Sequence, residues 1–183
     1  MRIDAKGMHY RQLNKIIREA VANGEKEFEL DDIGGQRYIG AGLNDSIKIT
    51  INGTPGNDLG AFMDAARLIV HGNAQDQLGQ IMKRGKLVVY GDVGQTFMYG
   101  AKGGEVYVLG NAAGRPFINA VGKPRAVING TALDFLAESF MAGDPHHGGG
   151  FIILNGLVID ADGTVTTPET PYPGSNLFSL ASG

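Results

Sequence analysis

Four segments of the chain repeat one pattern: ITING at residues 49–53, LIVHG at 68–72, LVVYG at 87–91 and VYVLG at 106–110. Each segment ends in glycine, and the four glycines follow one another at intervals of 19 residues. Two further copies, AVING and IILNG, end at Gly130 and Gly156, after one interval that is longer by a single residue and another that is longer by seven. The seven extra residues of the last interval match DPHHGGG at 144–150, a composition typical of a loop. Without this loop all six copies stay in phase.

This period, with one glycine-terminated strand per copy, is too short for a propeller blade or a helical pair and fits one coil of a solenoid. Stacked coils would place equivalent residues about 4.8 Å apart and direct two columns of each strand inwards. These columns are Ile49, Leu68, Leu87, Val106, Ala126, Ile152 and Ile51, Val70, Val89, Val108, Ile128, Leu154. A third column, six residues after each glycine, predicts a second wall: Leu59, Leu78, Phe97, Pro116 and Leu136. The sequence therefore predicts an all-β fold, a single-stranded β-helix.

The repeated glycines are predicted to be structural turn residues. A coil must turn corners, corners often need positive φ, and stacked corners leave little room for a Cβ atom. A phosphate-binding role is excluded because no dinucleotide or P-loop fingerprint lies between a strand and a helix. The set comprises Gly53, Gly72, Gly91, Gly110, Gly130 and Gly156.

Both ends of a solenoid leave strand edges unpaired, and the N-terminal sequence offers a cap for one of them. From Tyr10 to Ala22 apolar residues recur at helical spacing, and Asn23-Gly24 provides a stop. We expect residues 1–24 to form this capping segment and residues 25–165 the β-helix. Residues 28–43 read as an imperfect first coil, with Gly34 placed one period before Gly53, and residues 166–183 as an extended arm.

Composition excludes several kinds of site and partner. The 183 residues carry a net charge of −3, which gives no footprint for nucleic acid or anionic lipid. The absence of cysteine excludes a disulfide framework, a thiolate metal site, an iron–sulfur cluster and a cysteine nucleophile. Neither a signal peptide nor an apolar run long enough to span a membrane is found, so we expect a cytoplasmic protein.

No catalytic, cofactor-binding or metal-binding residue is predicted in this chain. His146 and His147 are neighbours on a glycine-rich loop, where two side chains seldom point at one metal ion. His71 occupies the position before a repeated glycine and reads as a turn residue. The acidic pairs at 31–32 and 160–162 match no calcium-loop spacing and are expected to be solvated turns.

One pattern does suggest binding. Between the two inward columns lies an outward column in which five of six residues are apolar, although a solvent-facing column is normally polar. Six coils would make a strip about 25 Å long, of the kind that exposed apolar patches mark as docking surfaces. Alternatively, the C-terminal arm or the N-terminal helix of this chain folds back and covers this outward column. The apolar members, our predicted docking face, are Ile69, Val88, Tyr107, Val127 and Ile153.

A mostly cationic column runs beside this face. It consists of Lys48, Arg67, Lys86, Glu105 and Arg125. Like charges at this spacing repel, so either neighbouring acids such as Glu105 or the carboxylates of a partner are expected to relieve them.

Several glycine-containing blocks occur in the order of a known family. INGTPGNDLGAFM (51–63), VHGNAQDQLGQIMKRG (70–85) and INGTALDFLAESFMAG (128–143) resemble the GXGXG domain of glutamate synthase. IDAKGMHYRQLN (3–14) and ETPYPGSNLFSLASG (169–183) are similar to its stand-alone form in split, archaeal-type glutamate synthases. The resemblance implies a right-handed β-helix that is itself non-catalytic.

The resemblance also implies partners. In this family the β-helix packs against an amidotransferase part, which frees ammonia from glutamine, and against an FMN-containing part. FMN and an iron–sulfur cluster would therefore reside on partner subunits, in glutamate biosynthesis, and a homo-oligomer through the solenoid ends is left open.

Two alternatives remain. The equivalent GXGXG subunit of formylmethanofuran dehydrogenase shares the repeat, although NDLGAF and PYPGSNLFSLASG favour glutamate synthase. An enzyme built on a solenoid is the rival of another class. Hexapeptide acyltransferases need a period near 18, and lyases need a carboxylate cluster that the outward column lacks.

Overall fold

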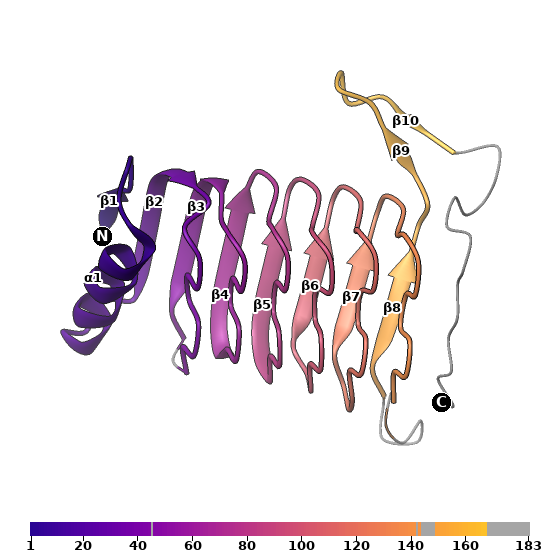
Figure 1. Ribbon diagram of the computed structural model, residues 1–183, viewed down its shortest axis with the longest axis horizontal. Coiled ribbons are helices and arrows are strands. Elements are labelled where there is room, and N and C mark those ends of the chain that lie inside the picture. Colours follow the sequence, from indigo (N-terminus) through magenta and orange to yellow (C-terminus); the bar gives the residue numbers. More distant parts are fainter. Residues whose placement is uncertain (45, 142, 144–148, 168–183) are drawn as a thin grey trace.

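The computed structural model describes residues 1–44, 46–141, 143 and 149–167, which form one helix and a row of strands (Figure 1). The elements are β1 (Arg2–Asp4), α1 (Tyr10–Ala22), β2 (Glu27–Gly34), β3 (Lys48–Thr54), β4 (Asp64–His71), β5 (Arg84–Val89), β6 (Glu105–Val108), β7 (Arg125–Ile128), β8 (Phe151–Leu154), β9 (Val158–Ile159) and β10 (Val165–Thr166). Strands β1 to β8 form one parallel sheet in chain order, and β9 and β10 form a separate hairpin. In the described part of the chain, no helix is long and apolar enough to cross a bilayer.

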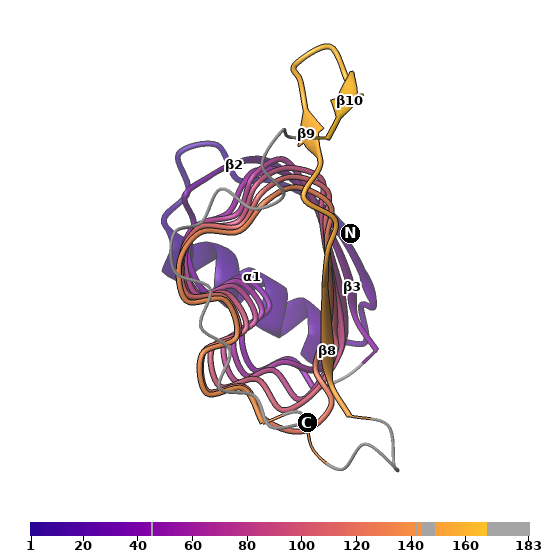
Figure 2. The same cartoon turned by 90° about the vertical axis from the view of Figure 1, so that its right-hand side faces the viewer.

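The coils superimpose in the register that the repeat predicts. Ile49 pairs with Leu68, Leu68 with Leu87 and Leu87 with Val106, each exactly one period apart in the sequence. The two longer intervals nearer the C-terminus keep the alignment through β7 and β8. The chain ascends along the strands and returns along a second wall, so that the coils overlie one another in the end-on view (Figure 2). The predicted right-handed β-helix is confirmed.

The core fills the space between the two walls. In β3 to β7 every residue of both inward columns is at most 2% exposed, whereas Ile152 and Leu154 of β8 are half-buried. Each large aliphatic side chain buried in this way contributes roughly 1.5–3 kcal/mol. The interior of the solenoid is thus closed along its length and looser at its C-terminal end.

The N-terminal end is capped as predicted. Helix α1 begins at Tyr10 and ends at Ala22, and it lies across the open end of the solenoid (Figure 2). Leu13 and Ile17, at most 2% exposed, belong to the same core cluster as the strands. No pattern in the sequence indicated the short strand β1, which pairs in parallel with β2 and continues the sheet beyond the first coil.

The first coil differs from the prediction. Phe28 pairs with Ile49, which lies two residues farther along the chain than one period, and a bulge between Leu30 and Ile33 shifts the register. As a result Ile33, rather than Gly34, lies opposite Gly53. The bulge accommodates one extra residue of β2 between Leu30 and Ile33, where Asp32 has φ of 52°.

The second wall is not a strand. In each coil three residues at alternate positions take left-handed φ values between 53° and 70°. The middle one donates its N–H to the preceding coil, as from Gly79 to Leu59 O at 2.8 Å, and the flanking ones donate to the following coil, as from Asp58 to Asp76 O at 3.0 Å. A left-handed L-residue costs roughly 1–2 kcal/mol. Hydrogen bonds to both neighbouring coils hold this backbone in place.

Side-chain sizes on the two walls are complementary. Where the middle left-handed residue is Gly60 or Gly79, leucines of the strand column fill the space: a Cβ atom on Gly60 would lie 3.1 Å from Leu68 and 3.2 Å from Leu87, and one on Gly79 would lie 2.9 Å from Leu87. Farther along the solenoid the same wall position holds Met98 and Phe117 while the strand column narrows to Val106 and then Ala126. Phe117 packs edge-to-face against Phe97 and Phe140, with ring centroids 5.4 and 5.9 Å apart.

Candidate docking surface

The outward column of the strands is the main feature of the solenoid surface. Its members are Thr50, Ile69, Val88, Tyr107, Val127 and Ile153, which we call the apolar strip. Each side chain is shielded by the ones above and below it, so most are half-buried, while Tyr107 and Ile153 are 40% and 46% exposed. Helix α1 lies across the end of the solenoid and leaves the strand face open, and the β9–β10 hairpin projects from its upper edge (Figure 2). Most of the arm, residues 168–183, lies outside the described residues.

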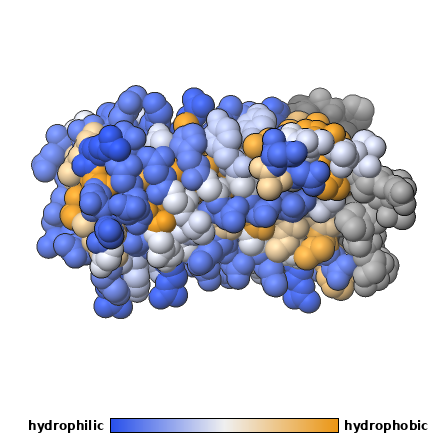
Figure 3. All heavy atoms as spheres, turned by 90° about the horizontal axis from the view of Figure 1, so that it is seen from above, coloured by the Kyte–Doolittle hydropathy of each residue, from blue (hydrophilic) through white to orange (hydrophobic). Residues whose placement is uncertain are grey.

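A second outward column continues this apolar surface toward the glycine corner. Tyr90 and Leu109 are 53% and 41% exposed, and Tyr90 stacks on His71 with ring centroids 4.9 Å apart. Between the two columns lies a shallow hollow of about 230 Å³, lined by Val88, Tyr90, Tyr107, Leu109, Val127 and Asn129 among others. Such a hollow, apolar with a polar rim, suits one anchoring side chain of a partner. Viewed from above, hydrophobic atoms interrupt the polar surface in the C-terminal half of the molecule as well as near the N-terminal cap (Figure 3).

The charged column beside the strip is partly neutralised within the chain. Lys86 Nζ lies 2.9 Å from Glu105 Oε2 and 5.1 Å from the centre of the Tyr107 ring, and the Tyr107 hydroxyl donates to Glu105 at 3.2 Å. The hydrogen bond from Lys86 is the main cause that holds the pKa of the Glu105 carboxyl below its usual value, against the opposing effect of burial. Lys48 similarly lies 3.7 Å from Glu27. Acids of this chain thus relieve part of the repulsion.

The repeated glycines stack in one column at the end of the strands. Backbone N–H groups donate along it, from Gly91 to Gly72 at 3.0 Å and from Gly110 to Gly91 at 3.1 Å. Only part of the set has positive φ: Gly53, Gly72 and Gly156. At the remaining positions crowding excludes a side chain, since a Cβ atom on Gly110 would clash with Asp92 Oδ1 and lie 2.8 Å from Gly91 O.

A ladder of polar side chains, which was not predicted from the sequence, follows the glycine column. Asn73 Oδ1 accepts the backbone N–H of Asp92 at 2.9 Å, Asp92 Oδ1 accepts that of Asn111 at 2.7 Å, and Asn111 Oδ1 accepts that of Thr131 at 2.9 Å. The sequence does carry this pattern, because the four ladder residues directly follow Gly72, Gly91, Gly110 and Gly130. These bonds fix the corner and the upper rim of the apolar surface.

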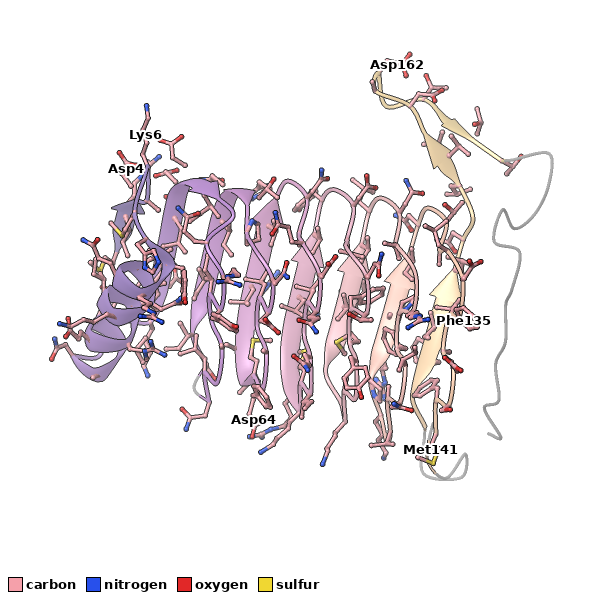
Figure 4. The ribbon with its side chains drawn as sticks, viewed as in Figure 1. Asp4, Lys6, Asp64, Phe135, Met141 and Asp162 are labelled. Carbon is pink, nitrogen blue, oxygen red and sulfur yellow. The ribbon has the colours of Figure 1, made fainter. Side chains whose placement is uncertain are left out.

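A wide hollow of about 1160 Å³ lies beside the first coil, and charged and polar side chains such as Arg2, Asp31 and Asn52 line part of it. Asp31, expected to be a solvated turn residue, is instead paired there: Arg2 Nε lies 2.5 Å from Oδ2, and the Asn52 amide donates to Oδ1 at 2.8 Å. These two hydrogen bonds lower the pKa of the Asp31 carboxyl. Asp4 and Lys6 point away from the solenoid at this end (Figure 4).

The remaining candidate residues are the histidines and acids that could bind a metal ion. Within the described ranges no group of three or more histidine, aspartate or glutamate side chains could hold a metal ion. His146 and His147 lie outside the described residues, as does most of the predicted loop at 144–150. The apolar strip, with its hollow and charged flank, is therefore the arrangement best suited to binding.

The chain matches the model of a known protein family. The model of the family described as GXGXG motif matches residues 30–160. Among curated proteins, a stretch of 64 residues is 45% identical to the uncharacterized protein MJ1350 of Methanocaldococcus jannaschii and covers 33% of this chain. The match spans 24% of that relative's length. No solved structure matches the chain.

Proposed function

The chain belongs to the GXGXG motif family, and from this membership we propose that it is a non-catalytic β-helix subunit of a glutamate synthase-like complex. Its task is to hold the amidotransferase part and the FMN-containing part in relation to each other during glutamate synthesis. The cofactors FMN and an iron–sulfur cluster belong to the partners. The chain itself contributes a rigid surface, in the cytoplasm.

The apolar strip is the observation that carries this proposal. Isolated soluble proteins seldom leave a contiguous row of valine, isoleucine and tyrosine on a sheet face, and such rows mark protein interfaces. The strip is also rigid, because its strands are paired on both sides from β3 to β7 and anchored by the buried inward columns. A rigid apolar face favours docking of a preformed partner, since little side-chain entropy is lost on binding.

The test is co-purification with the FMN-containing subunit of a split glutamate synthase, co-expressed with this chain. In the double variant Val88→Glu/Tyr107→Glu two carboxylates would be buried in the interface without partners, so the complex should be lost. Tyr99→Glu places one such carboxylate on another exposed aromatic residue, on the second wall, and should retain binding. Circular dichroism and thermal unfolding of each purified variant report whether it is folded.

The outcomes separate the two parts of the proposal. Retained binding by the folded double variant contradicts docking on the apolar strip. Failure of the unaltered chain to bind the flavoprotein contradicts the assignment to a glutamate synthase-like complex. Turnover of a sugar polymer or an acyl donor by the pure chain contradicts the non-catalytic role.

A further inference from the structure

Positive charge is concentrated where strands β4 to β7 begin. We call this group of side chains the basic edge. Its members are Arg67, Lys83, Arg84, Lys86, Lys102, Lys123 and Arg125, accompanied by the acids Asp64 and Glu105. Nitrogen-bearing side chains gather along the lower border of the sheet near the labelled Asp64 (Figure 4). Since the whole chain has a net charge of −3, this border is strongly polarised relative to the rest of the molecule.

The two acids neutralise only part of the basic edge. Arg84 Nε lies 2.5 Å from Asp64 Oδ1, and Lys86 pairs with Glu105. Among the described residues no ion pair within 4.0 Å engages Lys83, Lys102 or Arg67. Successive coils are about 4.8 Å apart, so these cations repel one another along the edge. An anionic ligand would relieve that repulsion.

A hollow of about 230 Å³ lies within the basic edge. Its floor is bare backbone at Gly85 and Gly104, and its rim carries Arg84, Lys123 and Arg125 together with the carboxylate of Glu105, which Lys86 engages. Gly85 has φ of 109°, and a Cβ atom there would clash with Ala66 O, so the floor cannot easily acquire a side chain. Three cations against one acid that is already paired leave the rim net positive, and the bare floor gives room for a carboxylate.

The basic edge is continuous with the apolar strip. Lys86 belongs to the edge and lies over the ring of Tyr107, which belongs to the strip. Arg125 likewise lies 5.7 Å from the ring centre of Phe151, next to the strip on β8. A partner seated on the strip therefore meets the edge along the same border.

We propose that the basic edge binds an acidic segment of the partner that docks on the apolar strip, with one carboxylate seated over Gly85 and Gly104. The proposal rests on the proposed function and adds the chemistry of the partner. A protein segment with apolar and acidic side chains complements both surfaces. RNA fits less well, because Lys86 already covers the Tyr107 ring on which a base could stack.

The probe is a fluorescein-labelled peptide of alternating glutamate and leucine, measured by fluorescence anisotropy at low salt. Lys83→Glu/Lys102→Glu reverses two cations of the edge that no described acid pairs. Lys6→Glu/Arg18→Glu makes the same change of charge at the N-terminal end. We expect the first variant to weaken peptide binding about tenfold and the second to leave it nearly unchanged, since only the first alters the local field.

A peptide of alternating lysine and leucine should bind poorly, and added salt should weaken binding of the acidic peptide to the unaltered chain. Equal loss in both double variants, or tighter binding of a uridine oligonucleotide than of the acidic peptide, overturns the proposal. Lys83→Gln/Lys102→Gln should weaken binding less than the reversal does, which guards against misfolding as the cause.

This experiment needs no synthase subunit, so its result is independent of the proposed function. In one outcome, peptide binding does not depend on the basic edge while Val88→Glu/Tyr107→Glu still abolishes capture of the flavoprotein. This result supports docking on the apolar strip and contradicts binding of an acidic segment at the edge. If the peptide binds the basic edge but no flavoprotein is captured, the edge binds acidic segments and the partner belongs to another complex.

Discussion

The inward and outward columns of β3 to β8 are made of similar residues and have different surroundings. Leu87 and Val88 are neighbours on one strand, yet Leu87 is fully buried by the second wall and Val88 is covered only by its own column. An apolar residue at these positions is expected to be shielded from water. Only the fold determines whether this chain or another protein shields it. On the inward side this chain supplies the cover itself. On the outward side, we propose, a partner supplies it.

The largest loss of stability is expected from a substitution in the core. Leu87→Ala leaves a cavity between β5 and the glycines of the second wall and should lower the free energy of unfolding by about 2–5 kcal/mol. Val88→Ala, one residue away on the outer face, should cost about 1 kcal/mol or less. Urea denaturation followed by circular dichroism measures both. Equal costs would show that the outer face is as well packed as the core.

Substitutions at the glycine corner test whether a position near the surface can tolerate a larger side chain as poorly as the core does. Gly110→Ala forces a Cβ atom against Asp92 Oδ1 and Gly91 O and should destabilise by about 1–3 kcal/mol. Gly34→Ala is the matched control, because it has open space and no positive φ, and it should be neutral or stabilise by up to about 1 kcal/mol. Melting temperatures of the two variants should move in opposite directions or differ clearly. An unchanged melting temperature in Gly110→Ala would show that the backbone of the corner shifts to admit the Cβ atom.

The polar ladder should have a smaller effect. Asn111→Ala removes the acceptor of the Thr131 backbone N–H and the amide that reaches Asp92, at an exposed site where water can substitute. We expect a loss of about 1 kcal/mol in urea denaturation. Hydrogen exchange at Thr131 should become faster, while exchange at the buried strand β5 stays slow. No local change in exchange would mean that the ladder does not hold the corner.

The ion pair beside the strip should have the smallest effect. Because Lys86 lowers the folded-state pKa of Glu105, the pair stabilises the protein above the unfolded pKa near 4.5 and loses that contribution as pH falls through the lower folded value. Glu105→Gln should therefore reduce the loss of stability on acidification below about pH 5, by about 1 kcal/mol or less for an exposed pair. Urea midpoints between pH 6 and pH 3 measure it. Identical acid dependence in both proteins would contradict the coupling.

Part of the fold was predictable because it depends on side-chain patterns. The register of β3 to β6 follows from apolar triplets at a fixed interval, that of β7 and β8 from the same triplets after longer intervals, and α1 from helical spacing ended by Asn23-Gly24. Strand β1 was missed because Arg2–Asp4 is too short to carry a pattern. The left-handed wall was missed because Phe62, Gln77 and similar residues do not favour positive φ.

The candidate site was predictable to the same degree. Alternation along the strands identified the apolar strip and its charged flank. The pairing of Lys86 with Glu105 and the hollow over Gly85 and Gly104 could not be foreseen, since both depend on which side chains of adjacent coils meet.

The sequence by itself determined that successive coils of one β-helix superimpose, because residues one period apart are alike and like apolar residues pack together when stacked. Tertiary structure alone decided the backbone of the second wall, the bulge that displaces Gly34 from Gly53, and the hollow over Gly85 and Gly104. The physical reason is range: a repeat is a local property of the chain, whereas a left-handed residue or a buried corner is stable only when hydrogen bonds and contacts from both neighbouring coils hold it.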